Sequence, residues 1–253
     1  MKIFIISEMT IYPELKKLCE KNSIQIEKKL ALKIMPVDYD ISELDSMIYS
    51  ADGLIFQSKN AVSYCKENYM AIRKRVELNE KQKTKNNALK IYSTGKYSAE
   101  NIKKLIGVKS EYNDNDFSSE GLLETIKDNC ESGDTFVVIK GMGGRNYTEE
   151  ELKKKNVFVK SYSVYDRESA GICIKNDNLV PDTNYFIITS LTALEILQDS
   201  LENISTNKVK IAIVPTKRIA ARIKDAIFDH SIIISNSATA EQYIREIVKN
   251  EKE

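Results

Sequence analysis

Short apolar runs alternate with amphipathic stretches along the whole chain. The first run, KIFIIS (2–7), is followed by a stretch that places Leu15, Leu18 and Cys19 on one helical face. Similar pairs recur to the end of the sequence. This alternation is typical of α/β proteins built on parallel sheets.

The pattern assigns a residue range to each element. Strands are expected at 2–7, 24–37, 53–58, 89–94, 136–141, 157–167, 185–190, 210–215 and 231–235. Helices are expected after the first strand and from about residue 60, and at 41–48, 98–106, 118–129, 148–155, 191–201, 217–226 and 238–248. The charged stretch RKRVELNEKQKTKNNALK (73–90) predicts a solvated helix or a surface excursion rather than a basic ligand patch, because glutamates interrupt it.

A weak internal similarity links the two parts of the sequence. FQSKNAVSYC (56–65) and ITSLTALEIL (188–197) both read as the end of a strand, a serine, a short polar turn and a helix with an early alanine. Two α/β units with corresponding strand-to-helix turns would explain the similarity. Ligands of such sheets bind beyond the carboxyl ends of the strands.

Composition narrows the function. The chain has 253 residues, and its 38 basic and 37 acidic residues nearly cancel, which argues against a nucleic-acid partner. The four cysteines form no C-x-x-C pair and there is one histidine, so neither a metal site nor a disulfide framework is expected. No apolar run reaches 18 residues and the first one is too short for a signal peptide, so a cytoplasmic protein without a membrane partner is expected.

Hydroxyl side chains are expected at four strand-to-helix turns: Ser58, Ser98, Ser190 and Thr216. Each could simply cap its helix, since Ser and Thr oxygens accept hydrogen bonds from N–H groups at the helix start. The same turns could receive carboxylates or phosphates, because the helix start presents unpaired N–H groups. A cluster of such turns would suit a ligand with many carboxylates.

The segment KGMGGR (140–145) directly follows an apolar strand. Its glycines, Gly141, Gly143 and Gly144, would let the backbone approach a ligand, and Arg145 would supply a forked cationic donor. A tight turn with a surface arginine is the plain alternative. The segment matches neither a Walker motif nor the G-x-G-x-x-G fingerprint.

Tyr165 closes the strand VFVKSYSVYDR (157–167). A tyrosine at a strand end can simply pack with its hydroxyl in water, or it can serve as a positioned general acid. Because His230 follows Asp229 in an expected loop, a phenol becomes a candidate for proton transfer.

Taken together, these segments resemble the uroporphyrinogen-III synthase family. The resemblance is carried by IFQSKNAVSY, TGKYSAENIKKLIGV, SSEGLLETI, IKGMGGRNYTEEELKKKNVFVKSYSVYDR, ITSLTALEIL and PTKRIAARIKDA, in the family's order across nearly the whole chain. The block from Gly141 to Arg167 is the most specific, with a glycine turn ending in Arg, a helix, and a strand ending in Val-Tyr-x-Arg.

The resemblance implies two α/β domains with parallel sheets, joined by a two-strand linker with the active cleft between them. Residues 1–36 and 169–253 would form a discontinuous first domain, and residues 37–168 an inserted second domain. It also implies a monomeric lyase that needs no cofactor and converts a linear tetrapyrrole polycarboxylate, hydroxymethylbilane, to uroporphyrinogen III.

By matching position, the resemblance gives each candidate residue a role. Tyr165 would assist departure of the hydroxyl group. The substrate carboxylates would be bound by Ser58, Ser98, Gly141, Gly143, Gly144, Arg145, Ser190 and Thr216. The alternatives from the residues alone are a non-catalytic two-domain receptor for a small ligand and a phosphate- or nucleotide-using transferase, for which a phosphate loop is missing.

Overall fold

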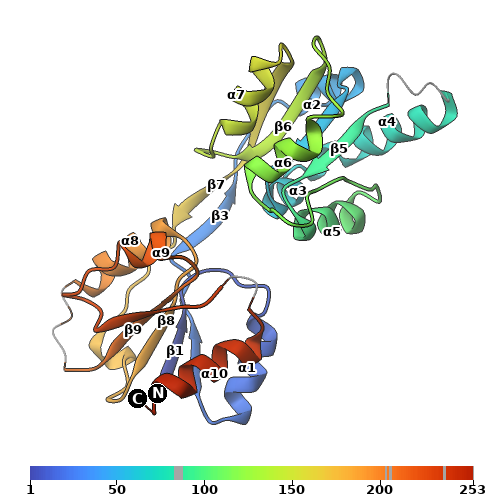
Figure 1. Cartoon of the computed structure of the whole chain (residues 1–253). Coiled ribbons are helices and arrows are strands. Elements are labelled where there is room, and N and C mark those ends of the chain that lie inside the picture. Colours follow the sequence, from blue (N-terminus) through green and yellow to red (C-terminus); the bar gives the residue numbers. More distant parts are fainter. Residues whose placement is uncertain (83–87, 203, 205–206, 236–237, 253) are drawn as a thin grey trace. The chain divides into compact units, whose positions relative to one another are not determined.

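The computed structural model describes residues 1–82, 88–202, 204, 207–235 and 238–252. The chain divides into two compact units, with unit 1 formed by Met1–Lys33 and Glu168–Glu253 and unit 2 by Ile34–Arg167. Each unit is built around a five-stranded sheet (Figure 1). The division falls inside the expected strand 24–37 and at the end of the expected strand 157–167.

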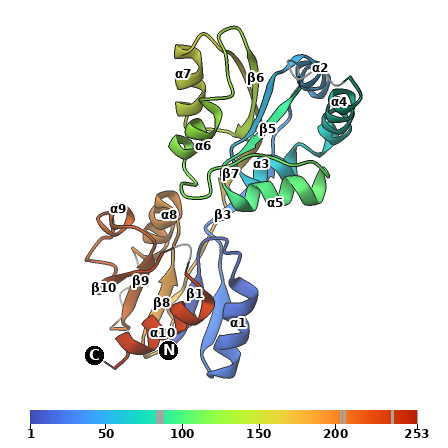
Figure 2. The ribbon, with the colours of Figure 1, turned by 45° about the vertical axis from the view of Figure 1, so that its right-hand side comes forward.

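The sheet of unit 1 is parallel throughout. Its order is β10 (His230–Ile233), β9 (Lys210–Val214), β8 (Asn184–Ile187), β1 (Lys2–Ile5) and β2 (Gln25–Lys28). Because side chains alternate along a strand, β1 directs Ile3 and Ile5 to one face and Phe4 to the other. Helices α1 (Tyr12–Lys21) and α10 (Ala240–Asn250) cover the first face, and α8 (Leu191–Leu201) and the short α9 (Lys217–Ala220) cover the second (Figure 2).

The sheet of unit 2 has the order β3 (Leu32–Pro36), β7 (Phe158–Ser169), β6 (Thr135–Gly141), β4 (Gly53–Phe56) and β5 (Lys90–Ser93). The pairs from β7 to β5 are parallel. The edge strand β3 runs antiparallel to β7, since Val37 N bonds to Val164 O while Ala170 N bonds to Ala31 O.

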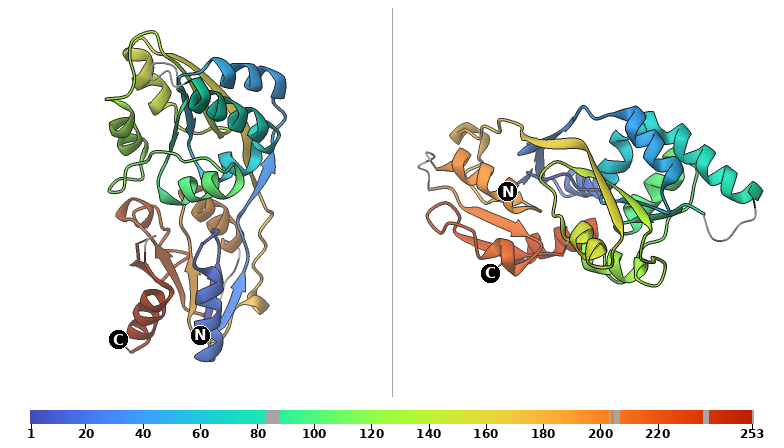
Figure 3. Two further views of the ribbon diagram at one scale, coloured as in Figure 1. Left: turned by 90° about the vertical axis from the view of Figure 1, so that its right-hand side faces the viewer. Right: turned by 90° about the horizontal axis from the view of Figure 1, so that it is seen from above.

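Helices also cover both faces of the unit 2 sheet. One face packs against α2 (Ile41–Ser50), α3 (Lys59–Tyr64), α4 (Tyr69–Gln82) and α5 (Lys96–Leu105), and a 3₁₀ turn at Lys66–Asn68 separates α3 from α4. The other face packs against α6 (Ser119–Ile126) and α7 (Tyr147–Lys154). Both chain ends belong to unit 1 (Figure 3). None of the described helices is long and apolar enough to cross a membrane.

Three expected elements were wrong in detail. The long strand 24–37 is two strands in different sheets, because its bonds to the first strand stop after those from Lys29 N and Ala31 N, and Val37 N instead bonds to Val164 O of β7. The helix 217–226 ends at Ala220, since the side chain of Gln198 accepts the Lys224 N–H that a longer helix would use.

His230 lies at the start of β10 rather than in a loop. Its side chain is exposed, and its Nε2 lies 2.9 Å from Asn250 Oδ1.

The charged stretch expected from residue 73 is confirmed as a helix as far as Gln82, where α4 ends. Residues 83–87 of that stretch lie outside the described residues.

Candidate active site

The carboxyl edge of the unit 2 sheet collects the candidate residues of that unit. Ser58 follows β4, and Gly141 ends β6. Tyr165 stands opposite Gly141 on β7. Because β4, β6 and β7 are parallel, these residues lie along one edge of the sheet, where α/β proteins bind ligands.

Two hydroxyl groups and a guanidinium meet at this edge. Ser58 Oγ lies 2.9 Å from Tyr165 Oη, and Arg167 Nη2 donates to the same phenolic oxygen at 2.8 Å. The Arg167 guanidinium also lies 5.1 Å from the centre of the Tyr165 ring. Ser58 Oγ accepts a further hydrogen bond from Ala61 N at 3.0 Å and so caps α3. Arg167, quoted in the sequence motif but given no role from sequence, is therefore part of the cluster.

Tyr165 is almost fully enclosed, with 1% of its surface exposed. The ring of Tyr64 packs against it at a centroid distance of 5.9 Å. Gly141 faces the phenol so closely that an added Cβ would lie 2.5 Å from Tyr165 Cζ and 2.8 Å from its Oη. Only glycine fits at this position without displacing the ring.

The glycine turn after β6 is tight. Gly143 has a φ of +66°, a region that glycine enters at little cost, and Gly144 N bonds to Gly141 O at 3.3 Å. The close approach at Gly141 and the left-handed backbone at Gly143 are two separate reasons for glycine within one short segment.

A buried ion pair anchors the turn, and sequence reasoning missed it. Lys140 Nζ lies 2.5 Å from Glu149 Oε1 and 2.7 Å from Asn146 Oδ1. Glu149 also accepts from Gln57 Nε2 at 3.1 Å and from Ser161 Oγ at 3.2 Å. Lys140 is 6% and Glu149 4% exposed, so each charge depends on the other and on these hydrogen bonds. A lysine closing an apolar strand, nine residues before a glutamate, was the available signal.

Arg145 points to a different part of unit 2. Its Nη2 lies 3.0 Å from Glu120 Oε1, and both side chains are exposed. Hydrogen bonds from the Glu120 backbone N–H and from Arg145 hold the pKa of the Glu120 carboxyl below its usual value. The structure therefore does not place Arg145 with the cluster of Ser58, Tyr165 and Arg167.

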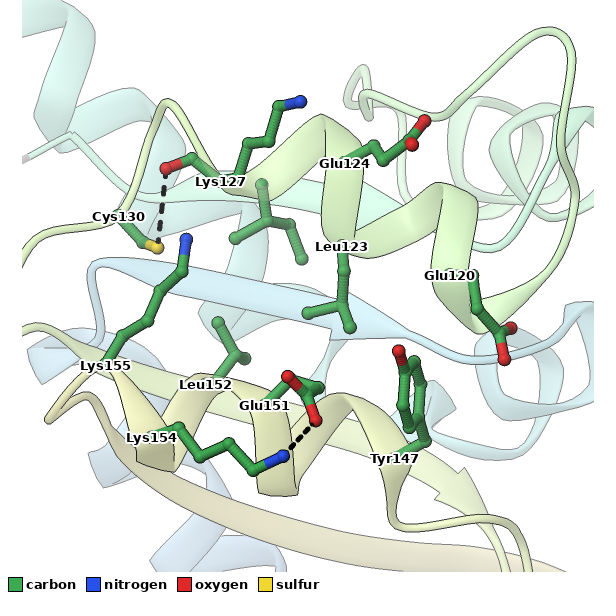
Figure 4. A pocket seen from close by; sticks show the side chains of 11 residues that line it. Glu120, Leu123, Glu124, Lys127, Cys130, Tyr147, Glu151, Leu152, Lys154 and Lys155 are labelled. Carbon is green, nitrogen blue, oxygen red and sulfur yellow. Dashed lines mark hydrogen bonds and ion pairs between the residues drawn. The ribbon is translucent and has the colours of Figure 1, made fainter.

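Glu120 is at one end of a groove between α6 and α7, with a volume of about 420 Å³ (Figure 4). Its floor is apolar and includes Leu123, Ile126 and Leu152. Its rim carries charges of both signs, and Lys154 and Glu151 pair with each other at 2.5 Å. The rim holds three lysines and three glutamates, so it carries no net charge that would attract a ligand with many carboxylates, and the groove is not the candidate site.

The expected role of Ser98 as a helix cap was wrong. Helix α5 starts two residues earlier, at Lys96, and its cap is Gly95 with a φ of +82°. Ser98 is buried in the first turn, and its hydroxyl faces Thr94 O at 3.4 Å. The Ser98 hydroxyl therefore bonds back to Thr94, just before the helix, and does not form the start of α5.

Unit 1 carries its own pair of hydroxyl-bearing turns. Ser190 follows β8 and accepts from Ala193 N at 3.2 Å, and Thr216 follows β9 and accepts from Ile219 N at 3.4 Å. Both are confirmed as helix caps, and they lie at the carboxyl edge of two adjacent parallel strands. Ser190 repeats the cap of Ser58, with the same alanine three residues on, as the internal similarity predicted.

Within the described residues, no three His, Cys, Asp or Glu side chains are grouped so that they could hold a metal ion.

The fold and the site define an α/β protein with two parallel-dominated sheets and polar strand-to-helix turns at their carboxyl edges. Residues 14–176, more than half of the chain, match the family model of uroporphyrinogen-III synthase HemD. The chain belongs to the uroporphyrinogen-III synthase family. It is therefore an enzyme of tetrapyrrole biosynthesis, with the function of a uroporphyrinogen-III synthase in haem biosynthesis and a small tetrapyrrole molecule as substrate.

Solved structures share the fold. The chain is similar to a mutant uroporphyrinogen III synthase from the extremely thermophilic bacterium Thermus thermophilus, with a TM-score of 0.58, 11% identity and 100% of both chains covered. It is also similar to uroporphyrinogen-III synthetase from Helicobacter pylori 26695, with a TM-score of 0.57, 15% identity, and coverage of 98% of this chain and 99% of the other. A search of curated proteins finds no match.

Proposed function

We propose that the enzyme is a lyase that closes hydroxymethylbilane to uroporphyrinogen III, with loss of water and inversion of ring D. The terminal hydroxymethyl group sits on an electron-rich pyrrole, and its departure leaves an azafulvene-type cation. Uncatalysed attack by the nearest free pyrrole carbon gives the symmetrical isomer. The enzyme would instead direct attack to the substituted carbon of ring D, and the resulting spiro intermediate would fragment and close again.

This reaction depends mainly on positioning of the bilane and on exclusion of the closure that gives the symmetrical isomer. Acetates and propionates of the bilane would be bound by backbone N–H groups and side chains at Ser58, Ser98, Gly141, Gly143, Gly144, Arg145, Ser190 and Thr216. The tight turns described above support this assignment, because helix starts and glycine turns favour bound anions. The two units would act as the enzyme's two domains, with no cofactor taking part.

Tyr165 is proposed as the acid that assists departure of the hydroxyl group. The observation that carries the proposal is the contact of Tyr165 Oη with Ser58 Oγ at 2.9 Å and with Arg167 Nη2 at 2.8 Å, at the carboxyl edge of the sheet. The phenol is thus held in one orientation by groups that would stabilise the charge left after proton donation.

Supplying hydroxymethylbilane and separating the type I and type III products tests the reaction directly. The protein is expected to give mainly the type III isomer. A product mixture identical to that formed without protein would refute the proposed function.

Tyr165→Phe tests the acid in the same assay. The variant is expected to lower kcat more than it raises KM, because the hydroxyl acts mainly in the transition state, and general acid assistance is typically worth about 10²–10⁴-fold. Tyr162→Phe removes a hydroxyl three residues earlier on β7 and is the matched control, expected to turn over like the wild type. Unchanged turnover of Tyr165→Phe would reject Tyr165 as the acid.

We also propose that the enzyme works as a cytoplasmic monomer without a nucleic-acid partner. The near balance of 38 basic and 37 acidic residues supports the last point. Size-exclusion chromatography with light scattering would test the oligomeric state.

A further inference from the structure

The hydrogen bonds around Ser58 and Tyr165 leave one proton without an acceptor. Arg167 can only donate, so Tyr165 Oη accepts from it, and Ser58 Oγ accepts from the N–H of Ala61. The two hydroxyls carry one proton each. One of these protons forms the 2.9 Å bond between them, in whichever direction it points. The other proton has no third acceptor among the described residues and is available to a ligand.

The hydroxyl groups of Tyr165 and Ser58 differ in their accessibility to a ligand. Tyr165 is 1% exposed and enclosed by Tyr64 and Gly141, whereas Ser58 is only partly buried. A group on a bound substrate would meet the serine first. The proton of the buried phenol can then reach it through Ser58 Oγ without movement of the tyrosine ring.

We propose that Ser58 is the outer end of a two-hydroxyl proton relay, with Tyr165 behind it and Arg167 as the counter-charge. The relay rests on the proposed function. It gives the Ser58 hydroxyl, which caps α3, a chemical step in place of a contact with a substrate carboxylate.

The step balances in protons and electrons. The Ser58 proton moves to the hydroxyl oxygen of the substrate while the C–O bond breaks, and the bonding electron pair leaves with the water molecule. The Tyr165 proton moves to Ser58 Oγ, and the phenolate is stabilised by the charge-assisted hydrogen bond from Arg167. When the macrocycle closes, the proton lost from the pyrrole carbon returns through Ser58 to Tyr165, so that only water is lost overall.

Substitutions of Ser58 test the relay in the full-length protein with hydroxymethylbilane. Ser58→Ala is expected to lower kcat by about 10²-fold, the lower end of the usual effect of general acid catalysis, with KM close to the wild-type value. Ser58→Thr restores a hydroxyl and is expected to recover most of the turnover. Ser58→Gly lacks the hydroxyl but is well tolerated at a helix cap, so it should repeat the loss of kcat even where the alanine variant folds poorly.

Ser118→Ala is the matched control. Ser118 caps α6 in the same unit through a 3.2 Å hydrogen bond from Gly121 N, so its loss removes a cap of the same kind without a tyrosine partner. It is expected to lower the melting temperature about as much as Ser58→Ala and to leave kcat unchanged. An equal loss of kcat in both variants would overturn the relay, because loss of a cap alone would explain it.

The double variant Ser58→Ala/Tyr165→Phe separates a relay from independent contacts. Residues that pass one proton act as a unit, so the double variant is expected to be about as slow as the slower single variant. A double variant whose loss of kcat equals the product of the two single losses would overturn the relay. A rise in KM at unchanged kcat in Ser58→Ala would also overturn it. Those outcomes leave the proposed function intact, whereas a wild-type protein that does not favour the type III isomer would refute the proposed function and the relay with it.

Discussion

Gly141→Ala should displace Tyr165, the proposed acid. The added Cβ would lie 2.5 Å from Tyr165 Cζ, whereas carbon atoms prefer a separation of about 3.5–4.0 Å. The ring would have to move by about 1 Å. It cannot turn aside freely, because its hydroxyl is bonded to Ser58 and Arg167 and its face packs against Tyr64.

Two effects follow, and they can be measured separately. Overpacking of this kind costs about 1–3 kcal/mol of folding free energy, which urea denaturation would show. Misplacement of a catalytic group by about 1 Å can cost about 10²-fold in rate, which kcat per folded molecule would show. Adding Gly141→Ala to Tyr165→Phe is expected to lower kcat little further, because the hydroxyl it displaces is already absent.

Gly53→Ala provides the control. Its Cβ would lie 2.2 Å from Phe136 Cε1, so it overpacks an aromatic ring of the same sheet, but at the start of β4 rather than at the carboxyl edge. It should reduce stability and leave the kcat of the folded protein unchanged. If Gly141→Ala loses stability as Gly53→Ala does and keeps full turnover, the position of the Tyr165 ring does not limit the reaction and the reasoning fails.

Three further predictions concern other parts of the molecule. Arg145→Ala should raise KM for the bilane while changing the unfolding free energy by less than about 1 kcal/mol, because its ion pair is exposed; equal affinity for wild type and variant would remove Arg145 from the binding site. Lys140→Met should cost about 3–5 kcal/mol in urea denaturation, since it leaves the Glu149 carboxylate buried without its partner, and a near-neutral result would contradict this. Iodoacetamide at about pH 8, read by mass spectrometry, should label exposed Cys173 and spare Cys19, because burial raises the pKa of the Cys19 thiol to about 11; rapid labelling of Cys19 would show that its core opens readily.

Local signals in the sequence were enough for most of the fold. Apolar runs bounded by turns marked the strands, and Ser58, Ser190 and Thr216 stand where a hydroxyl followed by helical periodicity predicts a cap. These features depend on neighbours within a few residues, which a single sequence displays directly.

The errors arose where a partner distant in sequence decides the local structure. Residues 24–37 look like one strand, yet pairing with β1 ends at Ala31 and the chain continues into the other sheet. The helix after Thr216 stops because a buried Gln198 accepts a backbone N–H. The sequence shows a lysine near the end of an apolar strand and a glutamate nine residues later, but it does not show that Lys140 and Glu149 pair, since the pair depends on burial that only the folded chain creates.

The place of Tyr165 shows how such a long-range feature builds the site. In β7, Tyr162 and Val164 face the core on the α2–α5 side, and strict alternation would turn Tyr165 to the opposite face. The register between β6 and β7 shifts after Lys140, so that Lys140 pairs with Ser163 but Gly141 pairs with Tyr165. Tyr165 therefore joins the same core as Tyr162 and Val164, as expected for a bulge that re-aims a side chain.

This irregularity falls between Lys140 and Gly141, the last two residues of β6, just before the glycine turn. Lys140 fixes the last regular pair, Gly141 leaves room for the phenol, and the Met142 N–H bonds to Tyr165 O at 2.8 Å. The Tyr165 hydroxyl thereby comes within 2.9 Å of Ser58 Oγ, in the turn that follows β4. The position of Tyr165 thus depends on the register of β6 and β7 and on the absence of a Cβ at Gly141. This is why the addition of one methyl group at Gly141 is expected to displace the ring.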